Sequence, residues 1–520
     1  MLASIAVLLG VEWAESEADG MANPRPLTIP ALRQWRGGSG TFELGRAPRI
    51  VVPARYRRRL RPTARVFGKD LARLTGRRVR VVDRRGARPR RGDIRLLLGA
   101  RDPTLGREGY RLRVGSSIGI RGGKAAGVFY GTRTVLQLLR QGPTVPAGRA
   151  RDWPRYPQRG LMIDNGRKYF TRRWIESHIH ELAYLKLNRL HLHFSDNQGF
   201  RIESESHPEI VSSAHLTMAE VRRILALARR YHVTVVPEFD MPGHMRAALA
   251  RHPELQLRDC SGQRQADKLD VSLPAARRFA RELIEEYTYL FPAREWHGGA
   301  DEYLLPQPEA AYALYPQLQR YARERYGEHA EGKDAYLDFI NWMNDVVRAR
   351  GKTLRIWHDG LSGGRAVLAR PGIVVEWWSD HAGPSPEDLL AGGHRILNAG
   401  WFPTYYVVGP TGALRPDLRT AYEMWEPNEF YGPFVSNETL RRPPHVVSAN
   451  EPRNLGSELH VWNDDPEGET EAQIAAGIQP RLRVMAQKTW GSARLTAAYA
   501  DFLPVIEAVS HAPGYDLPAP

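Results

Sequence analysis

Cysteine is nearly absent from this chain, which has 520 residues and one cysteine, Cys260. Because Cys260 has no partner in its own chain, a small fold stapled by disulfides is excluded. Long apolar runs are missing as well. Beyond the first dozen residues, no run approaches the roughly 18 apolar residues of a membrane helix, so we expect no membrane span.

Acidic residues are scarce in one segment. Residues 51–100 hold 16 Arg and one Lys against three Asp, a net charge of +14 in a chain whose total is +16. Aromatic residues, which nucleic-acid-binding surfaces place among basic ones, are scarce there too, Tyr56 and Phe67 being the only two. We therefore interpret the segment as a solvated basic face and expect no nucleic-acid partner.

The amino-acid composition is that of an ordinary globular protein, with 42% hydrophobic and 25% charged residues. The chain is long enough for more than one domain. Residues 1–25 are set apart as a leader or disordered N-terminus. Residues 2–11 resemble the apolar part of a secretory signal, but no basic stretch precedes them and Glu12 follows at once. The expectation is a secreted or extracellular protein if this segment is a signal, and a cytoplasmic one otherwise.

A Pro- and Gly-containing stretch at 141–160 divides the rest into two parts. Residues 26–150 predict a small, basic α/β domain. Its expected strands are 49–52, 78–83, 94–98, 110–114 and 117–121, and its expected helices are 62–74 and 127–140.

Residues 151–520 alternate short apolar strands with helical patterns, which predicts a (β/α)8 barrel, the TIM fold. The helical patterns are 172–186, 217–230, 275–289, 334–350 and 480–490. The eight predicted strands are Leu161–Asp164, Arg189–Phe194, Val233–Pro237, Glu295–Gly298, Leu354–Trp357, Ile373–Trp377, Arg395–Asn398 and Glu458–Trp462.

Acids, one arginine and large aromatic residues stand at the ends of these predicted strands, and a barrel brings all eight ends to one face. The residues are Asp164 with Arg167, His193 with Asp196, Glu238 with Asp240 and His244, Asp301 with Glu302, Trp357 with Asp359, Trp377 with Trp378, Asn398 with Tyr405 and Tyr406, and Trp462 with Asp464. Aromatic rings mixed with carboxylates suit a sugar, which has apolar C–H faces and many hydroxyls.

The segment Trp296–Tyr303, WHGGADEY, predicts the reaction. Asp301 and Glu302 are adjacent, so both can reach one ligand only if the chain leaves strand geometry, which the small residues before them allow. Contiguous carboxylates do not easily flank a glycosidic bond from opposite sides. An N-acetyl sugar removes this difficulty, because its own 2-acetamido oxygen can attack the anomeric carbon. Glu302 is then the general acid and later the base, and Asp301 orients the acetamido N–H.

Several motifs resemble glycoside hydrolase family 20, the β-N-acetylhexosaminidases and their relatives, over most of the chain. They are RGLMIDNGRKYF (159–170), KLNRLHLHFSDNQGFRIE (186–203), VVPEFDMPGH (235–244), HGGADE (297–302), LRIWHD (354–359), VVEWW (374–378) and VWND (461–464), with 109–139 resembling the domain before the barrel. The implied activity is retaining removal of terminal β-linked N-acetylhexosamine from an oligosaccharide or glycoconjugate, with no cofactor and no metal.

The resemblance also implies roles for individual residues. Arg167 would bind hydroxyls of the terminal sugar, and His244 and Asp196 would support the acid. Three tryptophans, Trp357, Trp378 and Trp462, would form the walls of the pocket. Tyr405, chosen over Tyr406, would donate a hydrogen bond to the acetamido oxygen.

Two positions depart from the family pattern. Ala300 stands where a second glycine is usual before the acid pair, and Asp464 stands where a glutamate is usual. Both substitutions are similar to those of lacto-N-biosidases, which release a terminal disaccharide, so that product is the alternative. Asp464, one methylene shorter, would leave room beyond the terminal sugar.

Two other classes remain as remote alternatives. His191 and His193 share one strand face and, with Asp196 and His244, could form a metal site of a metal-dependent barrel hydrolase. That site would lack further His or Lys ligands at the later strands. A non-catalytic sugar-binding barrel would keep the aromatic wall but has no need of adjacent Asp301 and Glu302. The oligomeric state does not follow from the sequence.

Overall fold

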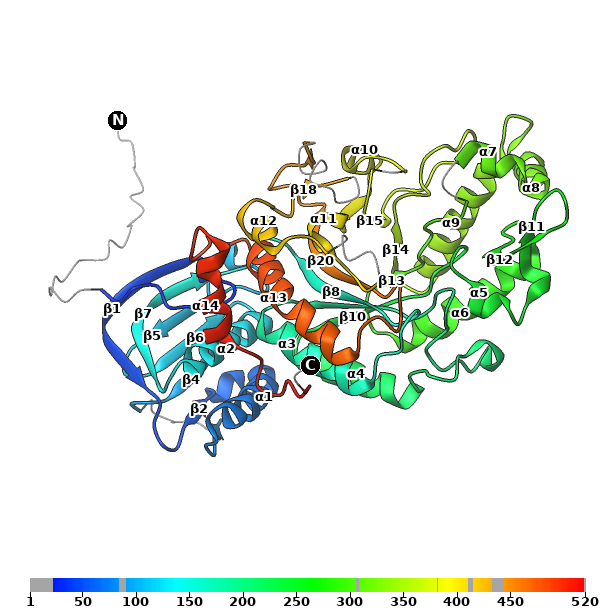
Figure 1. Ribbon diagram of the computed structural model, residues 1–520. Helices are drawn as coiled ribbons and strands as arrows, with labels where there is room; N and C mark the ends of the chain where they lie inside the picture. Colours follow the sequence, from blue (N-terminus) through cyan, green and yellow to red (C-terminus); the bar gives the residue numbers. More distant parts are fainter. Residues whose placement is uncertain are drawn as a thin grey trace, which may run out of the picture.

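The computed structural model describes residues 22–83, 90–304, 308–380, 382–409, 415–432 and 443–518, with the side chains of 308–310 left out. The expected leader therefore lies almost wholly outside the described residues. Two domains follow one another along the chain, a small sheet domain and a barrel (Figure 1). The predicted fold class, a (β/α)8 barrel preceded by a small α/β domain, is confirmed.

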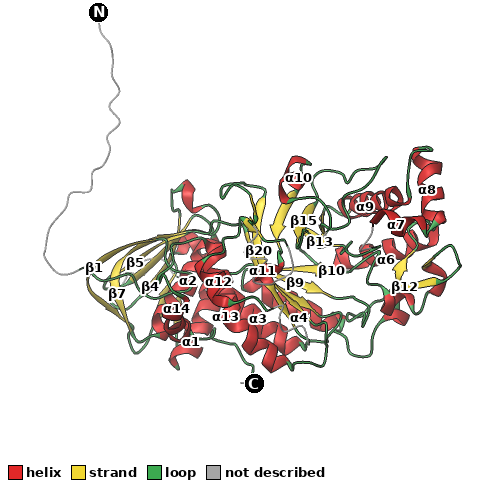
Figure 2. Ribbon diagram, turned by 45° about the horizontal axis from the view of Figure 1, so that its top comes forward, coloured by secondary structure: helices red, strands yellow, loops and turns green. Residues whose placement is uncertain are grey.

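The small domain is a seven-stranded mixed sheet with two long helices on one face (Figure 2). The helices are α1 (Arg57–Thr75) and α2 (Ala125–Arg140). The strands lie in the order β1-β7-β5-β6-β4-β2-β3, with bounds β1 (Gln34–Glu43), β2 (Arg49–Val51), β3 (Arg80–Val82), β4 (Ile94–Leu98), β5 (Tyr110–Val114), β6 (Ile118–Gly122) and β7 (Thr144–Asp152).

The sequence did not predict β1 or β7, which pair with each other in antiparallel register. Their glycines and prolines, among them Gly37, Gly38 and Pro146, obscured the apolar alternation that marks a strand. The stretch 141–160, interpreted as a divider, consists mostly of β7 and the start of the first barrel strand.

Eight parallel strands form the barrel, and the pairing of the seventh with the eighth and of the eighth with the first closes it. Each overlaps its predicted range. The strands are β8 (Gln158–Asp164), β9 (Arg189–His193), β10 (Thr234–Glu238), β13 (Glu295–His297), β14 (Thr353–Trp357), β15 (Val374–Trp377), β16 (Arg395–Asn398) and β20 (Asn454–Trp462).

Three of the long helices of this domain begin at threonine caps. Thr171, Thr217 and Thr470 each accept a hydrogen bond from the backbone of the first turn that follows. The five long helices of this domain, all anticipated by the sequence pattern, are α3 (Arg172–Tyr184), α4 (Met218–Arg230), α6 (Pro274–Leu290), α9 (Gly332–Ala349) and α13 (Glu471–Trp490).

Long excursions precede the fourth, fifth and eighth strands. They include the hairpin β11 (Gln256–Arg258) and β12 (Arg264–Leu269), and the helices α7 (Pro308–Ala313) and α8 (Pro316–Tyr326), which extend the barrel on one side (Figure 1). The other short elements are α5 (Arg246–Leu249), α10 (Pro386–Ala391), α11 (Trp401–Thr404), β17 (Tyr405–Val407), α12 (Leu418–Glu423), β18 (Glu429–Phe430), β19 (His445–Val446) and α14 (Tyr499–Val509).

Buried polar groups join the two domains. Asp152 at the end of β7 accepts a hydrogen bond from the indole of Trp490 at 2.8 Å and pairs with Lys186 at 2.9 Å. Lys186 and Asp152 are fully buried, so separating the domains would leave two charges without partners. These contacts therefore oppose separation of the barrel from the small domain. None of the described helices is long and apolar enough to cross a membrane.

Candidate active site

The backbone leaves strand geometry directly after β13, as the spacing of the two acids requires. Gly299, Ala300 and Glu302 have positive φ angles of 65°, 76° and 47°. A Cβ at Gly299 would lie 1.7 Å from Oδ1 of Asp240, so only glycine fits between this turn and the end of β10. Ala300 keeps its methyl group in a conformation that favours glycine, which costs about 1 kcal/mol. The turn directs both carboxylates toward one group.

That group is His244, which itself has a positive φ of 53°. Its Nε2 lies 3.6 Å from Oδ2 of Asp301 and 3.3 Å from Oε2 of Glu302. The side chain of Glu302 is 49% exposed, whereas that of Asp301 is 15% exposed. One acid therefore faces the solvent side of the mouth, and its neighbour lies deeper.

Behind His244 lies an alternating series of bases and acids. Its Nδ1 is 3.3 Å from Asp196, which also receives a hydrogen bond from His193 and an ion pair from Arg167, both at 3.0 Å. His193 in turn lies 2.8 Å from Glu238 at the end of β10. Burial alone would lower the pKa of His244, but Asp196 and Asp301 raise it well above its usual range. His244 is therefore a cation at neutral pH.

Arg167 is held in a fixed position at the mouth. It makes a 3.1 Å ion pair with Asp164, lies 5.0 Å from the ring centre of Trp462, and approaches Asp464 at 3.7 Å. Burial alone would lower the pKa of Arg167, but Asp196 and Asp164 raise it above its usual value. The guanidinium keeps a fixed charge and orientation, as a group that binds sugar hydroxyls needs.

The pKa of Glu302 is lowered, chiefly by its hydrogen bond to His244 and against the opposing effect of burial. The pKa of Asp301 is raised, first by burial and then by the negative charge of Glu302. Without a ligand, Glu302 is thus ionised beside a protonated His244. That direction is opposite to what the general acid expected from the sequence needs.

Two further acids complete the site, and the sequence placed both at strand ends without assigning them a role. Asp359 accepts hydrogen bonds from the backbone N–H of Glu302 at 2.8 Å and from the indole of Trp378 at 3.1 Å. Burial and the charge of Asp301 raise the pKa of Asp359 to about 7. Asp240 accepts from Ala300 N–H, and burial followed by Asp301 raises its pKa well above normal. A protonated Asp240 can share its proton with Asp301.

An aromatic wall stands beside the acids. Its members form one buried cluster with Met162, Ala399 and Val407, and they are Trp357, Trp378, Tyr405 and Trp462, with Trp401 packed against them. Trp357 and Trp462 have ring centres 5.7 Å apart, and Tyr405 lies 6.0 Å from Trp462. The indole of Trp357 donates to Glu238 at 2.8 Å, which links the wall to the acid–base series.

Three residues named at strand ends do not join this cluster. Trp377 packs toward Phe430 and His445, the hydroxyl of Tyr406 donates to Glu469, and Asn398 donates to backbone carbonyls of a loop. The choices of Trp378 over Trp377 and of Tyr405 over Tyr406 therefore agree with the packing. Asp464 lies at the rim with a half-exposed side chain, and burial raises its pKa.

Two other contributors, Trp401 and Lys268, were missed, and the sequence contained a signal for one of them. Trp401 follows β16 by three residues, the same strand-end position that identified the other aromatics, and stacks on Tyr405 at 5.2 Å. His193 and Glu238 were noted at strand ends, but their alternating contacts depend on the closed barrel. Lys268, which donates to the backbone carbonyl of Glu302 at 2.7 Å, comes from the β12 hairpin and had no signal.

Several groups of three acids and histidines lie close enough together to hold a metal ion, and they include His191, Glu238 and His297. These three are fully buried within the barrel and contact one another directly, with His191 2.9 Å and His297 3.1 Å from Glu238. The three side chains therefore form an ion-pair network, although both ring nitrogens of His191 and Nε2 of His297 have no hydrogen-bond partner among the described residues.

Comparisons with known proteins agree with this geometry. Residues 156–493 match the catalytic-domain model of glycosyl hydrolase family 20, and residues 25–153 match its domain 2. The chain is 31% identical to a lacto-N-biosidase of Bifidobacterium bifidum over 94% of its own length, which is 42% of that protein. It is also 30% identical to a β-N-acetylhexosaminidase of Cellulomonas fimi, over 81% of each chain.

A solved structure of a similar fold is the Streptomyces plicatus N-acetyl-β-hexosaminidase in complex with Thio-NAglucal. It is 26% identical with a TM-score of 0.71, and the match covers 96% of each chain. The two family models together span both domains described above, in the same order. The chain therefore belongs to glycosyl hydrolase family 20 and, with it, to the glycosidases.

Proposed function

We propose that this protein removes terminal β-linked N-acetylhexosamine from oligosaccharides or glycoconjugates, with retention of configuration, and that the 2-acetamido group of the substrate is the nucleophile. One observation supports this most directly: Asp301 and Glu302 approach the same nitrogen of His244 at 3.6 and 3.3 Å. In the two-carboxylate mechanism with retention, the carboxyl groups flank the bond about 5 Å apart on opposite sides. Two neighbours that meet on one histidine suit an assisted mechanism instead.

The first step would proceed as follows. The acetamido oxygen attacks the anomeric carbon, while Glu302 donates its proton to the leaving glycosidic oxygen. Asp301 accepts a hydrogen bond from the acetamido N–H and stabilises the positive charge of the oxazolinium intermediate. In the second step, Glu302 takes a proton from water, which attacks the anomeric carbon and restores the acetamido group.

Substrate binding would supply the protonation state that this step needs. The side chain of Glu302 is half exposed, and a sugar that covers it removes the water that stabilises its negative charge. Its pKa then rises, and Nε2 of the protonated His244 is 3.3 Å from Oε2 of Glu302. Asp196 and the groups behind it keep His244 in place to deliver that proton.

Release of a terminal disaccharide by the same chemistry is the second candidate. The Bifidobacterium bifidum lacto-N-biosidase matches over nearly the whole of this chain, and two residues of the site favour a similar pocket. Asp464 is half exposed at the rim, and Ala300 replaces a usual glycine directly before the acid pair. A short acid at the rim leaves space where a second sugar would extend.

Product analysis separates the two candidates. The enzyme is incubated with chitobiose and, separately, with a glycan that ends in lacto-N-biose, and the products are identified by mass. Free N-acetylhexosamine from chitobiose supports the first candidate, and an intact disaccharide from the second substrate supports the other. No hydrolysis of either substrate or of a chromogenic N-acetylglucosaminide would refute both.

Asp301→Asn tests the assisted mechanism itself. The amide has no negative charge to stabilise the oxazolinium ion, so we expect kcat on N-acetyl substrates to fall by about 10²- to 10³-fold. A rate equal to that of the unmodified protein would remove the proposed role of the acetamido group. Circular dichroism checks that the variant is folded.

A further inference from the structure

The sheet of the small domain has one covered face and one open face. Side chains alternate along β5, where Tyr110, Leu112 and Val114 are buried and Arg111 and Arg113 are exposed. The buried side packs against α1 and α2 (Figure 2). No described helix or strand lies over the other side, which faces away from the barrel (Figure 1).

Arginines form two rows across this open face, because the strand register places them side by side. The first row runs through Gln34, Arg151, Arg111, Arg121 and Leu97. The second row runs through Arg36, Arg149, Arg113, Gly119 and Arg95. With neighbouring strands about 4.8 Å apart, the second row spans about 19 Å.

An acid, Asp102, neutralises two arginines of the first row. Asp102 pairs with Arg111 at 3.0 Å and with Arg151 at 2.8 Å. In the second row, Arg36, Arg95 and Arg113 have no ion pair among the described residues. The register places Arg36 and Arg113 on either side of Arg149, and like charges directly opposite one another destabilise a sheet by up to about 1 kcal/mol per pair.

The face is also hollowed. A depression of about 1280 Å³ is lined by both rows, including Arg36, Arg95 and Arg113. Its floor contains Gly119, where an added Cβ would meet no atom within 4 Å. A chain lying along the second row would therefore have guanidinium groups on both sides of an open floor.

We propose that this face binds an anionic polysaccharide, one that carries carboxylate or sulfate groups along its length. The guanidinium fork matches a pair of acceptor oxygens and keeps its charge at any physiological pH. Among the described residues that line the hollow, Trp35 is the only aromatic one, which disfavours a single-stranded nucleic acid, whose bases stack on aromatic rings. A glycosidase held on an acidic glycan matrix stays close to its substrates.

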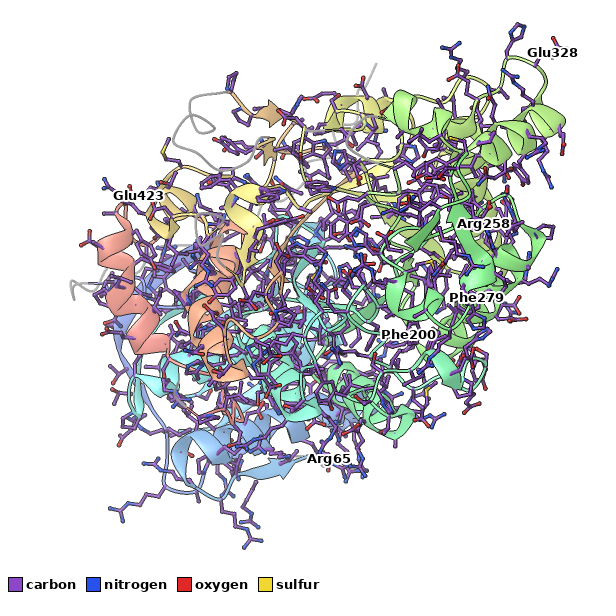
Figure 3. The ribbon with its side chains drawn as sticks, turned by 45° about the vertical axis from the view of Figure 1, so that its right-hand side comes forward. Arg65, Phe200, Arg258, Phe279, Glu328 and Glu423 are labelled. Atoms are coloured by element: carbon purple, nitrogen blue, oxygen red, sulfur yellow. The ribbon has the colours of Figure 1, made fainter. Side chains whose placement is uncertain are left out.

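The experiment compares two triple variants of the full chain for binding to heparin, a sulfated polysaccharide. The test variant is Arg36→Gln, Arg95→Gln and Arg113→Gln. The control is Arg58→Gln, Arg59→Gln and Arg65→Gln, which removes the same charge from exposed positions of α1, where Arg65 lies on the outer surface (Figure 3). We expect the test variant to bind about tenfold or more weakly, with a shallower salt dependence, and the control to bind within about twofold of the unmodified protein.

Hydrolysis of a small chromogenic N-acetylglucosaminide is measured on all three proteins and should be unchanged, because the mouth of the barrel lies in the other domain. Binding is read without turnover, so the result does not depend on the proposed reaction. Three results would each overturn the proposal. They are equal weakening of heparin binding in the control variant, tighter binding of duplex DNA or of anionic vesicles than of heparin, and no heparin binding at 50 mM salt. Removal of like charges should not lower the melting temperature, which checks that the test variant is folded.

Discussion

Replacement of Asp359 by asparagine should change how stability depends on pH. Asp359 is buried, with 3% of its surface exposed, and burial together with the charge of Asp301 raises its pKa from 3.8 to about 7. The folded protein therefore keeps a proton on Asp359 at pH values where the unfolded chain has lost it. Unfolding releases that proton, so rising pH favours unfolding between pH 4 and 7.

The size of the effect follows from the shift. A displacement from 3.8 to about 7 corresponds to about 4 kcal/mol, of which about 3 kcal/mol falls between pH 5 and pH 8. Asparagine resembles the protonated acid in shape but does not titrate. The free energy of unfolding of the unmodified protein, relative to that of Asp359→Asn, should therefore fall by about 3 kcal/mol from pH 5 to pH 8.

Denaturant unfolding at pH 5, 6, 7 and 8 measures this difference. Asp417→Asn is the matched control, because Asp417 is an exposed helix cap that accepts a hydrogen bond from Thr420. Its pKa is lowered, with hydrogen bonds to Thr420 outweighing the opposing effect of burial, so its contribution is already complete at pH 5. The control should lose a constant amount of stability across the range. A stability difference for Asp359→Asn that also stays constant would refute the reasoning.

Activity gives a second readout of the same residue. Asp359 accepts the backbone N–H of Glu302, a residue at positive φ whose position depends on that bond. Asparagine keeps one acceptor oxygen, so we expect kcat/KM to fall by about tenfold. Asp359→Ala leaves Glu302 N–H and the Trp378 indole without this acceptor, and displacement of the acid by about 1 Å should cost 10²-fold. Equal rates for the two variants would argue against a positioning role.

Three further outcomes are expected. Glu302→Gln should lower the rate on substrates with poor leaving groups by about 10²- to 10⁴-fold and spare activated aryl substrates, because only protonation is lost; equal losses on both would contradict the acid role. His244→Gln removes the cation that supplies the proton of Glu302, so the alkaline limb of kcat/KM, which the raised pKa of His244 sets in the unmodified protein, should move to lower pH, and an unmoved limb would mean that another group supplies the proton. Treatment with a chelator should leave kcat unchanged. Inactivation by the chelator that added metal reverses would favour the metal-dependent alternative.

The sequence was sufficient for the barrel and for most of its mouth. Eight apolar runs separated by helical patterns predicted the strands, and residues at the end of each run predicted the site, because parallel strands in a barrel all end on one face. The two strands missed in the small domain, β1 and β7, contain glycine and proline at positions that break the apolar alternation. These two strands are identified by their pairing with each other, and a pattern of neighbouring residues does not reveal a pairing between distant parts of the chain.

The arrangement of charge in the small domain also could not be predicted from local sequence. The count of charged residues placed the excess of positive charge in residues 51–100. The arginines of the open sheet face, however, come mostly from β1, β5, β6 and β7, which lie outside that segment. Along the chain they extend from Arg36 to Arg151, a separation of more than a hundred residues. Strand register, which no count contains, places Arg36 beside Arg149 and Arg149 beside Arg113.

Residue types and their spacing along the chain determined the fold class, the strand ends and the pair of adjacent acids, since each depends on neighbours a few positions away. Only the tertiary structure decided which groups hold protons. The pKa of Asp359 rises to about 7 because Asp359 is buried close to the charge of Asp301, which follows another strand. The pKa of Glu302 falls because His244, which follows a third strand, forms a hydrogen bond with it. Electrostatic interactions act through distance in space, which the order of residues does not specify.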